Sequence, residues 1–193
     1  MTTHRRGEII LIRHGRPRVS RVGLLSYTGF VAFLKEYEHA SLVANTQPPQ
    51  QLLRQLRCDA IILHSSLPRA AQSASIIGSL AQIARKEMVA DLLEIDLPPP
   101  PPARIMLPLR AWVLWARILW RLGPRERRLE CLQRVRRAAL TLEQFARGHS
   151  QVLVVAHGRV NSYLAMELSR RGWSGKRRRL TPYWGWERWS APA

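Results

Sequence analysis

Three short runs of branched apolar residues, each followed at once by polar residues, restrict the folds open to this 193-residue chain. They lie at 9–12, 61–63 and 152–155. A short apolar run without polar alternation is typical of a strand buried on both faces, as in a parallel sheet covered by helices. Helical spacing of apolar residues separates these runs, over 28–39, 51–56, 68–83 and 125–147. The alternation predicts an α/β fold over 1–193, a single domain with three α/β/α layers and a mostly parallel central sheet.

The segment between the second and third runs is less regular. A further strand is expected over 87–95, followed by five consecutive prolines at 98–102 that exclude regular structure. Pro108 is suited to the start of a helix and Gly123 to its end, so 108–122 is expected to be helical. We interpret 98–124 as an insertion in the domain, with its helix covering the active site.

The charge of the chain predicts an anionic partner. There are 31 Lys and Arg residues against 13 Asp and Glu, a formal net charge of +18, and arginine suits bidentate recognition of phosphate or carboxylate. A phosphorylated small molecule, nucleic acid and an acidic membrane surface all fit. No nucleic-acid recognition signature accompanies the charge, so nucleic acid is not expected. The amino-terminal residues lack the apolar stretch of a secretory signal, which favours a cytoplasmic location, either free or peripheral at the inner face of the membrane.

Polar residues with catalytic potential follow each predicted strand. His14 follows the first run, with Arg13 before it, and His157 follows the last, while the middle run leads through "HSSLPRA" to Arg69. Glu94 lies near the end of the further strand expected over 87–95. Because ligands in open parallel sheets bind beyond the carboxyl ends of the strands, these five side chains are expected to meet at one site.

That combination of groups is suited to phosphoryl transfer. An imidazole can act as a nucleophile near neutral pH, and guanidinium groups neutralise a dianionic phosphoryl group and its transition state. Gly15 would let the backbone approach the ligand and offer an unobstructed N–H. A carboxyl group at Glu94 could protonate the leaving oxygen and later accept a proton from water. The arginines supply the positive charge, so no metal and no cofactor is expected.

The sequences "LIRHGRP", "SSLPRAAQSA", "LLEIDLP" and "VVAHGR" together resemble the histidine phosphatase superfamily, the phosphoglycerate mutase-like family. The Arg-His-Gly motif of that family matches Arg13, His14 and Gly15. Its later arginine matches Arg69, and its second histidine matches His157. The family acid often follows Leu-Arg, whereas here Leu93 precedes Glu94.

The resemblance implies a phosphohistidine mechanism. His14 would attack phosphorus, Glu94 would protonate the leaving group, and water would hydrolyse the phosphoenzyme. Arg13, Arg69 and His157 would hold the phosphoryl oxygens. The further candidates for substrate binding are Gly15, Arg16, Ser66 and Gly158. Alternatively, Arg16 faces solvent. Ser66 could instead act with Ser65 as a cap of the following helix.

The helix expected over 108–122 has an unusual distribution of side chains. Arg110, Arg117 and Arg121 form one narrow stripe, and nearly every other position is apolar, including Trp112, Trp115 and Trp120. Either the helix packs over the active site as a lid, or residues 104–122 lie in the interface of an anionic membrane with tryptophans at headgroup depth. The aromatic, basic tail at 173–189 fits a membrane contact and equally a last strand with packed aromatic residues.

The leading hypothesis is a metal-independent phosphatase acting on a phosphomonoester or a diphosphate, with an apolar lipid or isoprenoid part in the substrate. The alternatives are a phosphomutase and a non-catalytic phosphate-binding or scaffold module at the membrane surface. Hydrolysis of a simple phosphate ester would separate the enzyme from the binding module.

Overall fold

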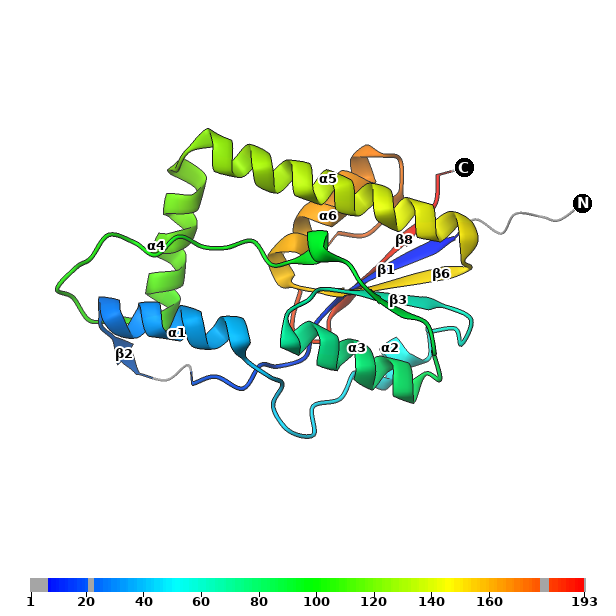
Figure 1. The fold of residues 1–193 in the computed structure, drawn as a ribbon, viewed down its shortest axis with the longest axis horizontal. Coiled ribbons are helices and arrows are strands. Elements are labelled where there is room, and N and C mark those ends of the chain that lie inside the picture. The colour runs from blue at the N-terminus through cyan, green and yellow to red at the C-terminus, as the bar shows by residue number, and fades with distance from the viewer. Residues whose placement is uncertain (1–6, 21–22, 178–180, 193) are drawn as a thin grey trace, which may run out of the picture.

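A six-stranded mixed sheet forms the centre of the computed structural model, which describes residues 7–20, 23–177 and 181–192 (Figure 1). In spatial order the strands are β4 (Lys86–Met88), β3 (Ile61–His64), β6 (Gln151–Ala156), β1 (Glu8–Arg13), β8 (Trp186–Ser190) and β7 (Ser174–Gly175). The first four strands in this order are mutually parallel, and β8 and β7 add antiparallel partners at one side. The predicted mostly parallel sheet is confirmed.

Helices cover both faces of the sheet because successive side chains of each central strand point to opposite sides. Ile9 and Leu11 pack on one side with Val152 and Val154, beneath α5 (Arg125–Gly148) and α6 (Gly158–Arg170). On the other side, Ile10 packs with residues of α2 (Gln50–Leu53) and α3 (Pro68–Leu80). Both sets of strand side chains are almost completely buried. The three-layer α/β/α arrangement inferred from the uninterrupted apolar runs is therefore confirmed.

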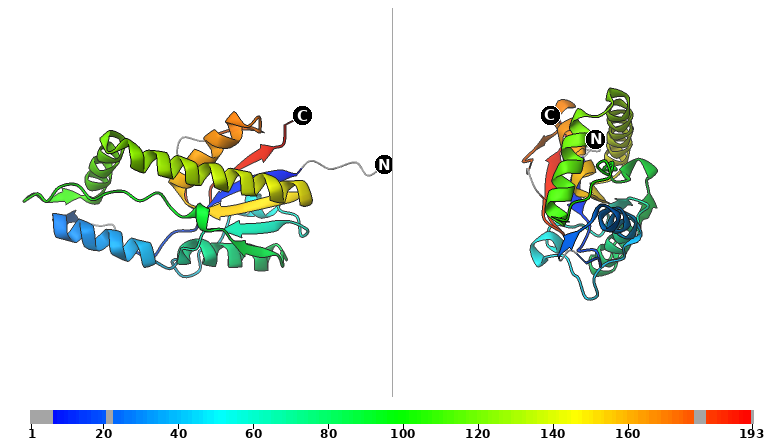
Figure 2. Two further views of the ribbon diagram at one scale, coloured as in Figure 1. Left: turned by 45° about the horizontal axis from the view of Figure 1, so that its top comes forward. Right: turned by 90° about the vertical axis from the view of Figure 1, so that its left-hand side faces the viewer.

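A smaller lobe projects beyond the carboxyl ends of the parallel strands, as Figure 2 shows. It consists of α1 (Tyr27–His39), α4 (Leu109–Leu122) and a two-stranded ribbon of β2 (Leu24–Leu25) and β5 (Leu107–Pro108). Trp112 is the centre of its small core: the indole stacks on Phe30 with ring centroids 5.4 Å apart and donates a hydrogen bond to the Leu25 carbonyl. Residues from 98–124 thus pack against α1, which comes from a distant part of the sequence.

Two sequence expectations about these elements need correction. The strand expected over 87–95 ends at Met88; a 3₁₀ turn, η1 (Ala90–Leu92), follows and buries Leu92 in the core, so Glu94 reaches the site from a loop. The tryptophans of α4 do not lie on a free surface: Trp112 and Trp120 are buried, and Trp115 stacks on Trp112. In the tail, Trp189 is buried in β8, as expected of a last strand with packed aromatic residues. Among the described helices, none combines the length and apolar character needed to cross a bilayer.

Candidate functional site

The register of the central strands brings the two predicted histidines together. Arg13 pairs with Ala156 across the parallel strands β1 and β6, so His14 and His157 leave the sheet at the same level. Their ring centroids are 5.0 Å apart, and both side chains are fully buried. Residues separated by most of the chain therefore share one site at the carboxyl end of the sheet.

A backbone hydrogen bond fixes the tautomer of His14. Its Nδ1 lies 2.7 Å from the Gly15 carbonyl oxygen, and a carbonyl oxygen only accepts, so Nδ1 carries the proton in the neutral ring. The lone pair of the neutral imidazole is consequently on Nε2, which is the arrangement a nucleophilic histidine requires.

His157 is held by Ser65, at the end of β3. Its Nε2 lies 2.9 Å from Ser65 Oγ, and its buried Nδ1 has no hydrogen-bond partner among the described residues. Burial lowers the pKa of the His157 imidazole well below its ordinary value, and the charges of His14, Arg69 and Arg13 lower it further. The His157 imidazole is therefore uncharged near neutral pH. Its Nδ1 is a buried polar nitrogen to which no described protein group is hydrogen-bonded.

Two arginines flank the histidine pair. Arg13 donates to the Thr181 carbonyl and stacks on Tyr183, with its guanidinium carbon 4.3 Å from the ring centroid. Arg69, only 1% exposed, donates to the carbonyls of Tyr37 and Glu38 at the end of α1. The buried Nε atoms of both arginines lack a partner among the described residues. Burial lowers the pKa of Arg69, since desolvation disfavours the cation, although the charges of Tyr37, Glu94, Tyr183 and Glu38 act in the opposite direction. An anion at this position would satisfy both guanidinium groups.

Glu94 lies at the amino-terminal end of α6. Its Oε1 accepts hydrogen bonds from the backbone N–H groups of Ile95, at 2.9 Å, and Val160, at 3.3 Å. Desolvation raises the pKa of the Glu94 carboxyl above its ordinary value, although these N–H groups and the charges of Arg159 and Arg69 act in the opposite direction. From α5, Arg134 donates to the carbonyls of Asp91, Leu93 and Glu94 and so fixes the loop.

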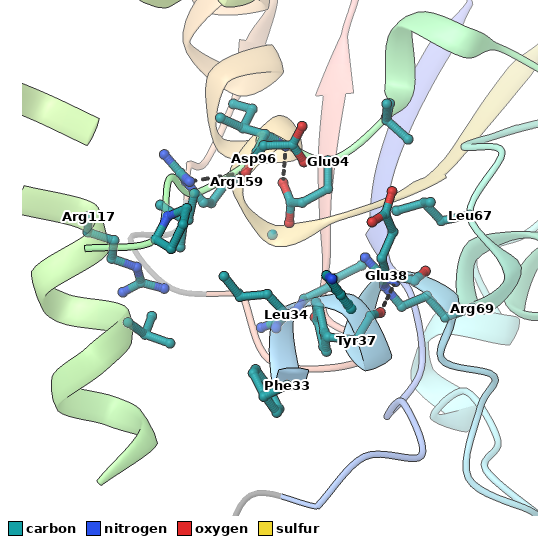
Figure 3. A pocket seen from close by; sticks show the side chains of 18 of the residues that line it. Phe33, Leu34, Tyr37, Glu38, Leu67, Arg69, Glu94, Asp96, Arg117 and Arg159 are labelled. Atoms are coloured by element: carbon teal, nitrogen blue, oxygen red, sulfur yellow. Dashed lines mark hydrogen bonds between the residues drawn. The ribbon is translucent and has the colours of Figure 1, made fainter. Parts of the chain in front are cut away.

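A cleft of about 640 Å³ lies between the lobe and the groups that surround the two buried histidines (Figure 3). Arg13, Arg69, Glu94 and Gly158 line one part of it. The rest is largely apolar and is formed by α1, α4 and the segment after Glu94, with the side chains Val31, Phe33, Leu34, Leu97, Leu109 and Val113. The described lobe therefore covers the strand-end site with an apolar wall.

Three of the predicted substrate-binding residues are placed differently from the expectation. The Gly15 N–H donates to Ser73 Oγ at 2.9 Å, and a Cβ at Gly15 would lie 2.6 Å from the Trp184 ring. The glycine is thus required by packing, and its N–H is not unobstructed. Arg16 and Ser66 are exposed and do not line the cleft. The helix α3 begins after Leu67 without a side-chain cap, so the expected Ser65 and Ser66 cap is wrong; Leu67 N–H makes only a long contact, 3.4 Å, to Ser65 Oγ.

Sequence reasoning missed four contributors to the site. Ser65 bonds to His157, Tyr37 and Tyr183 stack on the two arginines, and Arg159 lines the cleft beside Glu94. Arg159 could have been found, because it directly follows His157 and Gly158 in "AHGR". The two tyrosines gave no such signal, since each lies far along the chain from the arginine that it contacts.

Comparisons with known proteins agree with this geometry. A profile of the histidine phosphatase superfamily (branch 1) matches residues 9–185. The fold is similar to that of a mycobacterial glucosyl-3-phosphoglycerate phosphatase, with a TM-score of 0.56, 18% identity, and coverage of 94% of this chain and 89% of that one. An alpha-ribazole phosphatase from Shigella flexneri has a TM-score of 0.54 and 19% identity, with coverage of 94% and 89%.

No curated protein sequence matches the chain. At these identities the solved structures establish a common fold, and the family follows from the profile, which spans most of the sequence. The resemblance read from the four sequence motifs is thereby confirmed. The chain belongs to the histidine phosphatase superfamily, branch 1, and is a phosphatase of that superfamily.

Proposed function

We propose that this protein is a metal-independent phosphatase that forms a phosphohistidine intermediate on His14 and acts on a phosphorylated substrate with an apolar part. One observation carries the proposal: His14 and His157 lie with ring centroids 5.0 Å apart, next to two arginines whose buried Nε atoms lack a partner among the described residues. Imidazole and guanidinium groups without a counter-ion are suited to a dianionic phosphoryl group.

In the first step, Nε2 of His14 attacks phosphorus while the bond from phosphorus to the leaving oxygen breaks. The negative charge on the equatorial oxygens is neutralised by Arg13 and Arg69. With the Ser65 hydroxyl donating to Nε2 of His157, Nδ1 carries the ring proton and donates a further hydrogen bond. Gly158 begins α6, whose amino-terminal end adds a favourable dipole beside the phosphoryl group. The Nδ1 hydrogen bond to Gly15 orients the attacking ring.

Glu94 moves the proton in both steps. Its raised pKa favours a protonated carboxyl that donates to the departing oxygen, which leaves as an alcohol. The resulting carboxylate then accepts a proton from water as water attacks the phosphohistidine and releases inorganic phosphate and free His14. The backbone N–H groups of Ile95 and Val160 hold the carboxyl in place during this exchange.

The apolar wall of the cleft supports a substrate with a lipid or isoprenoid part. Leu34 on α1 and Leu109 and Val113 on α4 line the same cleft as Arg13 and Arg69. Burial of an apolar chain against this wall stabilises the complex by about 25 cal/mol per Å². A small, fully polar substrate would leave this wall unused.

Hydrolysis of 4-nitrophenyl phosphate in excess chelator tests the proposal. We expect turnover that His14→Ala lowers by at least about 10³-fold. We also expect an acid-labile, alkali-stable phosphoryl label on the wild-type protein that His14→Ala lacks. Inactivity across a broad panel of phosphate esters would favour a non-catalytic binding module. Transfer of phosphate between hydroxyls without release of inorganic phosphate would favour a mutase.

An exposed face of α4 supports a peripheral membrane contact. The side chains that would enter the bilayer are leucine and isoleucine, and not the tryptophans expected from the sequence. Leu114, Ile118 and Leu122 are 58%, 47% and 79% exposed and lie one helical turn apart in a single stripe. The exposed side chains of Arg110 and Arg121 run beside it, and the sequence has no acidic residue between Asp96 and Glu126. We propose that this face binds an anionic bilayer, with the leucines and isoleucine at acyl depth and the arginines at the phosphates.

Sedimentation with vesicles tests this contact. We expect binding to phosphatidylglycerol vesicles at low salt, little binding to phosphatidylcholine vesicles, and loss of binding in Leu114→Gln with Ile118→Gln. Leu140→Gln is the matched control, because Leu140 is similarly exposed, at 46%, but lies on α5. Absence of binding to the anionic vesicles, or an equal loss with the control, would reject the contact.

A further inference from the structure

A second group of positive charge lies in the cleft, separate from the pair that flanks the histidines. Arg159 and Arg117 both line the cleft, the first from α6 and the second from α4. In Figure 3, Glu94 lies between Arg69 on one side and Arg159 and Arg117 on the other. The cleft thus has cationic groups on both sides of the carboxyl that faces the leaving oxygen.

Two hydrogen bonds connect the Arg159 side chain to the loop of Glu94. Arg159 Nη1 donates to the Ile95 carbonyl at 3.1 Å, and Glu94 Oε1 accepts from Val160 N–H, the residue after Arg159. The guanidinium group also lies over Trp120, 4.7 Å from the ring centroid. These contacts hold the cation beside Glu94 at the wall of the cleft.

Cationic side chains outnumber acidic ones along the cleft. Neither Arg159 nor Arg117 forms an ion pair within 4 Å in the part of the chain that the structure describes. Burial lowers the pKa of Arg159; the charge of Glu94 raises it, and the charge of Arg117 lowers it further. The cleft is lined by five cationic side chains, Arg13, Lys35, Arg69, Arg117 and Arg159, and by three acidic ones, Glu38, Glu94 and Asp96. Protonation of Glu94 increases the excess of positive charge.

The position of Arg159 and Arg117 indicates which part of the substrate they would contact. The terminal phosphoryl group occupies the space near His14, and the leaving oxygen must face Glu94. A group attached directly to the leaving oxygen therefore lies next to Arg159. If that group is itself a phosphate, its charge is neutralised by Arg159 and Arg117, and the organic tail continues along Leu109 and Val113 on α4.

We propose, on the basis of the proposed function, that the bond cleaved is a phosphoanhydride and the substrate is a diphosphate ester with an apolar organic group. Nε2 of His14 forms the bond to the terminal phosphorus, and the bond from that phosphorus to the bridging oxygen breaks. The electron pair stays on the bridging oxygen, which takes the Glu94 proton and leaves as a monophosphate ester. Water then hydrolyses the phosphohistidine and yields inorganic phosphate.

The test compares farnesyl diphosphate, farnesyl monophosphate and 4-nitrophenyl phosphate as probes. We expect the wild type to have the highest kcat/KM for the diphosphate and to release inorganic phosphate and farnesyl monophosphate, not pyrophosphate and farnesol. Arg159→Gln should lower kcat/KM for the diphosphate about 10- to 100-fold. The same variant should change kcat/KM for the monophosphate much less, and Arg159→Lys should restore part of the loss.

Arg117→Gln gives an independent measurement at an exposed position. It should selectively lower activity on the diphosphate, whereas Arg121→Gln, one turn along α4 and outside the cleft, should have no effect. Equal losses on all probes in Arg159→Gln would overturn the proposal, because they would show that Arg159 only positions Glu94. Preference for the monophosphate, or release of pyrophosphate, would also overturn it. Turnover of 4-nitrophenyl phosphate alone would refute the diphosphate substrate while leaving the phosphatase intact, and no turnover of any probe would refute the proposed function itself.

Discussion

The strand-end site and the α1/α4 lobe differ sharply in how their side chains are held. At the strand ends, His14 and His157 have no exposed surface, and each is fixed by a hydrogen bond to Gly15 or Ser65. Among the described residues, the core of the lobe contains four buried side chains, Phe30, Leu109, Trp112 and Ala116, and several apolar side chains lie on its outer surface. Strand ends therefore hold the proposed reacting groups, and a lobe with a small core lines the rest of the cleft.

The two regions are therefore suited to two different tasks. Phosphoryl transfer needs the nucleophile, the arginines and the acid within a narrow range of positions, which buried strand ends provide. Recognition of an apolar chain needs surface area and tolerates adjustment, which a small lobe provides. Substitutions at the strand ends should thus affect turnover of every substrate, and substitutions in the lobe should affect some substrates selectively.

The largest effect that distinguishes the two regions is expected from Glu94→Gln. The amide cannot donate an acidic proton, so kcat on an alkyl phosphate should fall by about 10²- to 10⁴-fold. The fall should be much smaller on 4-nitrophenyl phosphate, whose leaving group needs little protonation. Steady-state kinetics with both substrates measure this difference. Asp91→Asn is the control, since Asp91 lies in the same segment as Glu94 but forms an ion pair with the exposed Arg137. Equal losses of kcat on the two substrates in Glu94→Gln would show that Glu94 is not the acid.

Trp112→Ala should have a large effect confined to the lobe. The substitution removes a fully buried indole, its stacking on Phe30 and its hydrogen bond to Leu25, and such changes cost about 3–5 kcal/mol. Hydrogen exchange should accelerate in α1 and α4 while amides of β1 and β6 remain protected. Activity on 4-nitrophenyl phosphate should persist. Equal acceleration in the sheet would show that lobe and sheet form one cooperative unit.

The meeting of His14 and His157 was predictable from sequence because of the regularity of parallel sheets. A strand buried on both faces leaves a continuous apolar run, and its carboxyl end is marked by the first polar residues, so His14 and His157 could be placed side by side without coordinates. The placement of Arg69 beside them was predictable because this residue lies in the first turn of a helix that follows such a strand. The helix of α4 was likewise predictable to within a residue, from Pro108 and Gly123.

The parts that depend on contacts between distant segments could not be read in the same way. Gly15 was expected to present its N–H to a ligand, but Ser73 and Trp184 occupy both sides of it. The apolar character of α4 was compatible with a lid or a membrane contact, since nothing in its own sequence shows that Phe30 covers Trp112. In "HSS", neither serine carries a mark that distinguishes the buried Ser65 from the exposed Ser66.

The two serines offer a smaller but well-matched test of the strand-end site. Ser65→Ala removes the partner of a buried imidazole, and an unsatisfied buried group costs about 1–3 kcal/mol, so kcat/KM should fall about tenfold on every substrate. Ser66→Ala, at the adjacent exposed position, should leave kcat/KM unchanged. Similar losses for both variants, or a loss only with Ser66→Ala, would mean that His157 is not positioned by Ser65.

The pH dependence should show the smallest effect, and it follows from the direction of the pKa shift of Glu94. Desolvation raises this pKa, so the protonated form needed for the first step persists to higher pH than for an ordinary carboxyl, and activity falls as the pH rises through the raised pKa. The folded state also holds this proton more tightly than the unfolded chain, so the contribution of Glu94 to stability is complete below its ordinary pKa and is lost as the pH rises through the folded value. His157, whose pKa is lowered, acts in the opposite direction: the unfolded chain holds this proton more tightly than the folded state, so stability increases as the pH rises from the lowered pKa to the ordinary pKa of histidine. Profiles of kcat on an alkyl phosphate should therefore have an alkaline limb that is absent in Glu94→Gln and unchanged in Trp112→Ala. An alkaline limb that survives in Glu94→Gln would assign the proton transfer to a group outside the strand-end site.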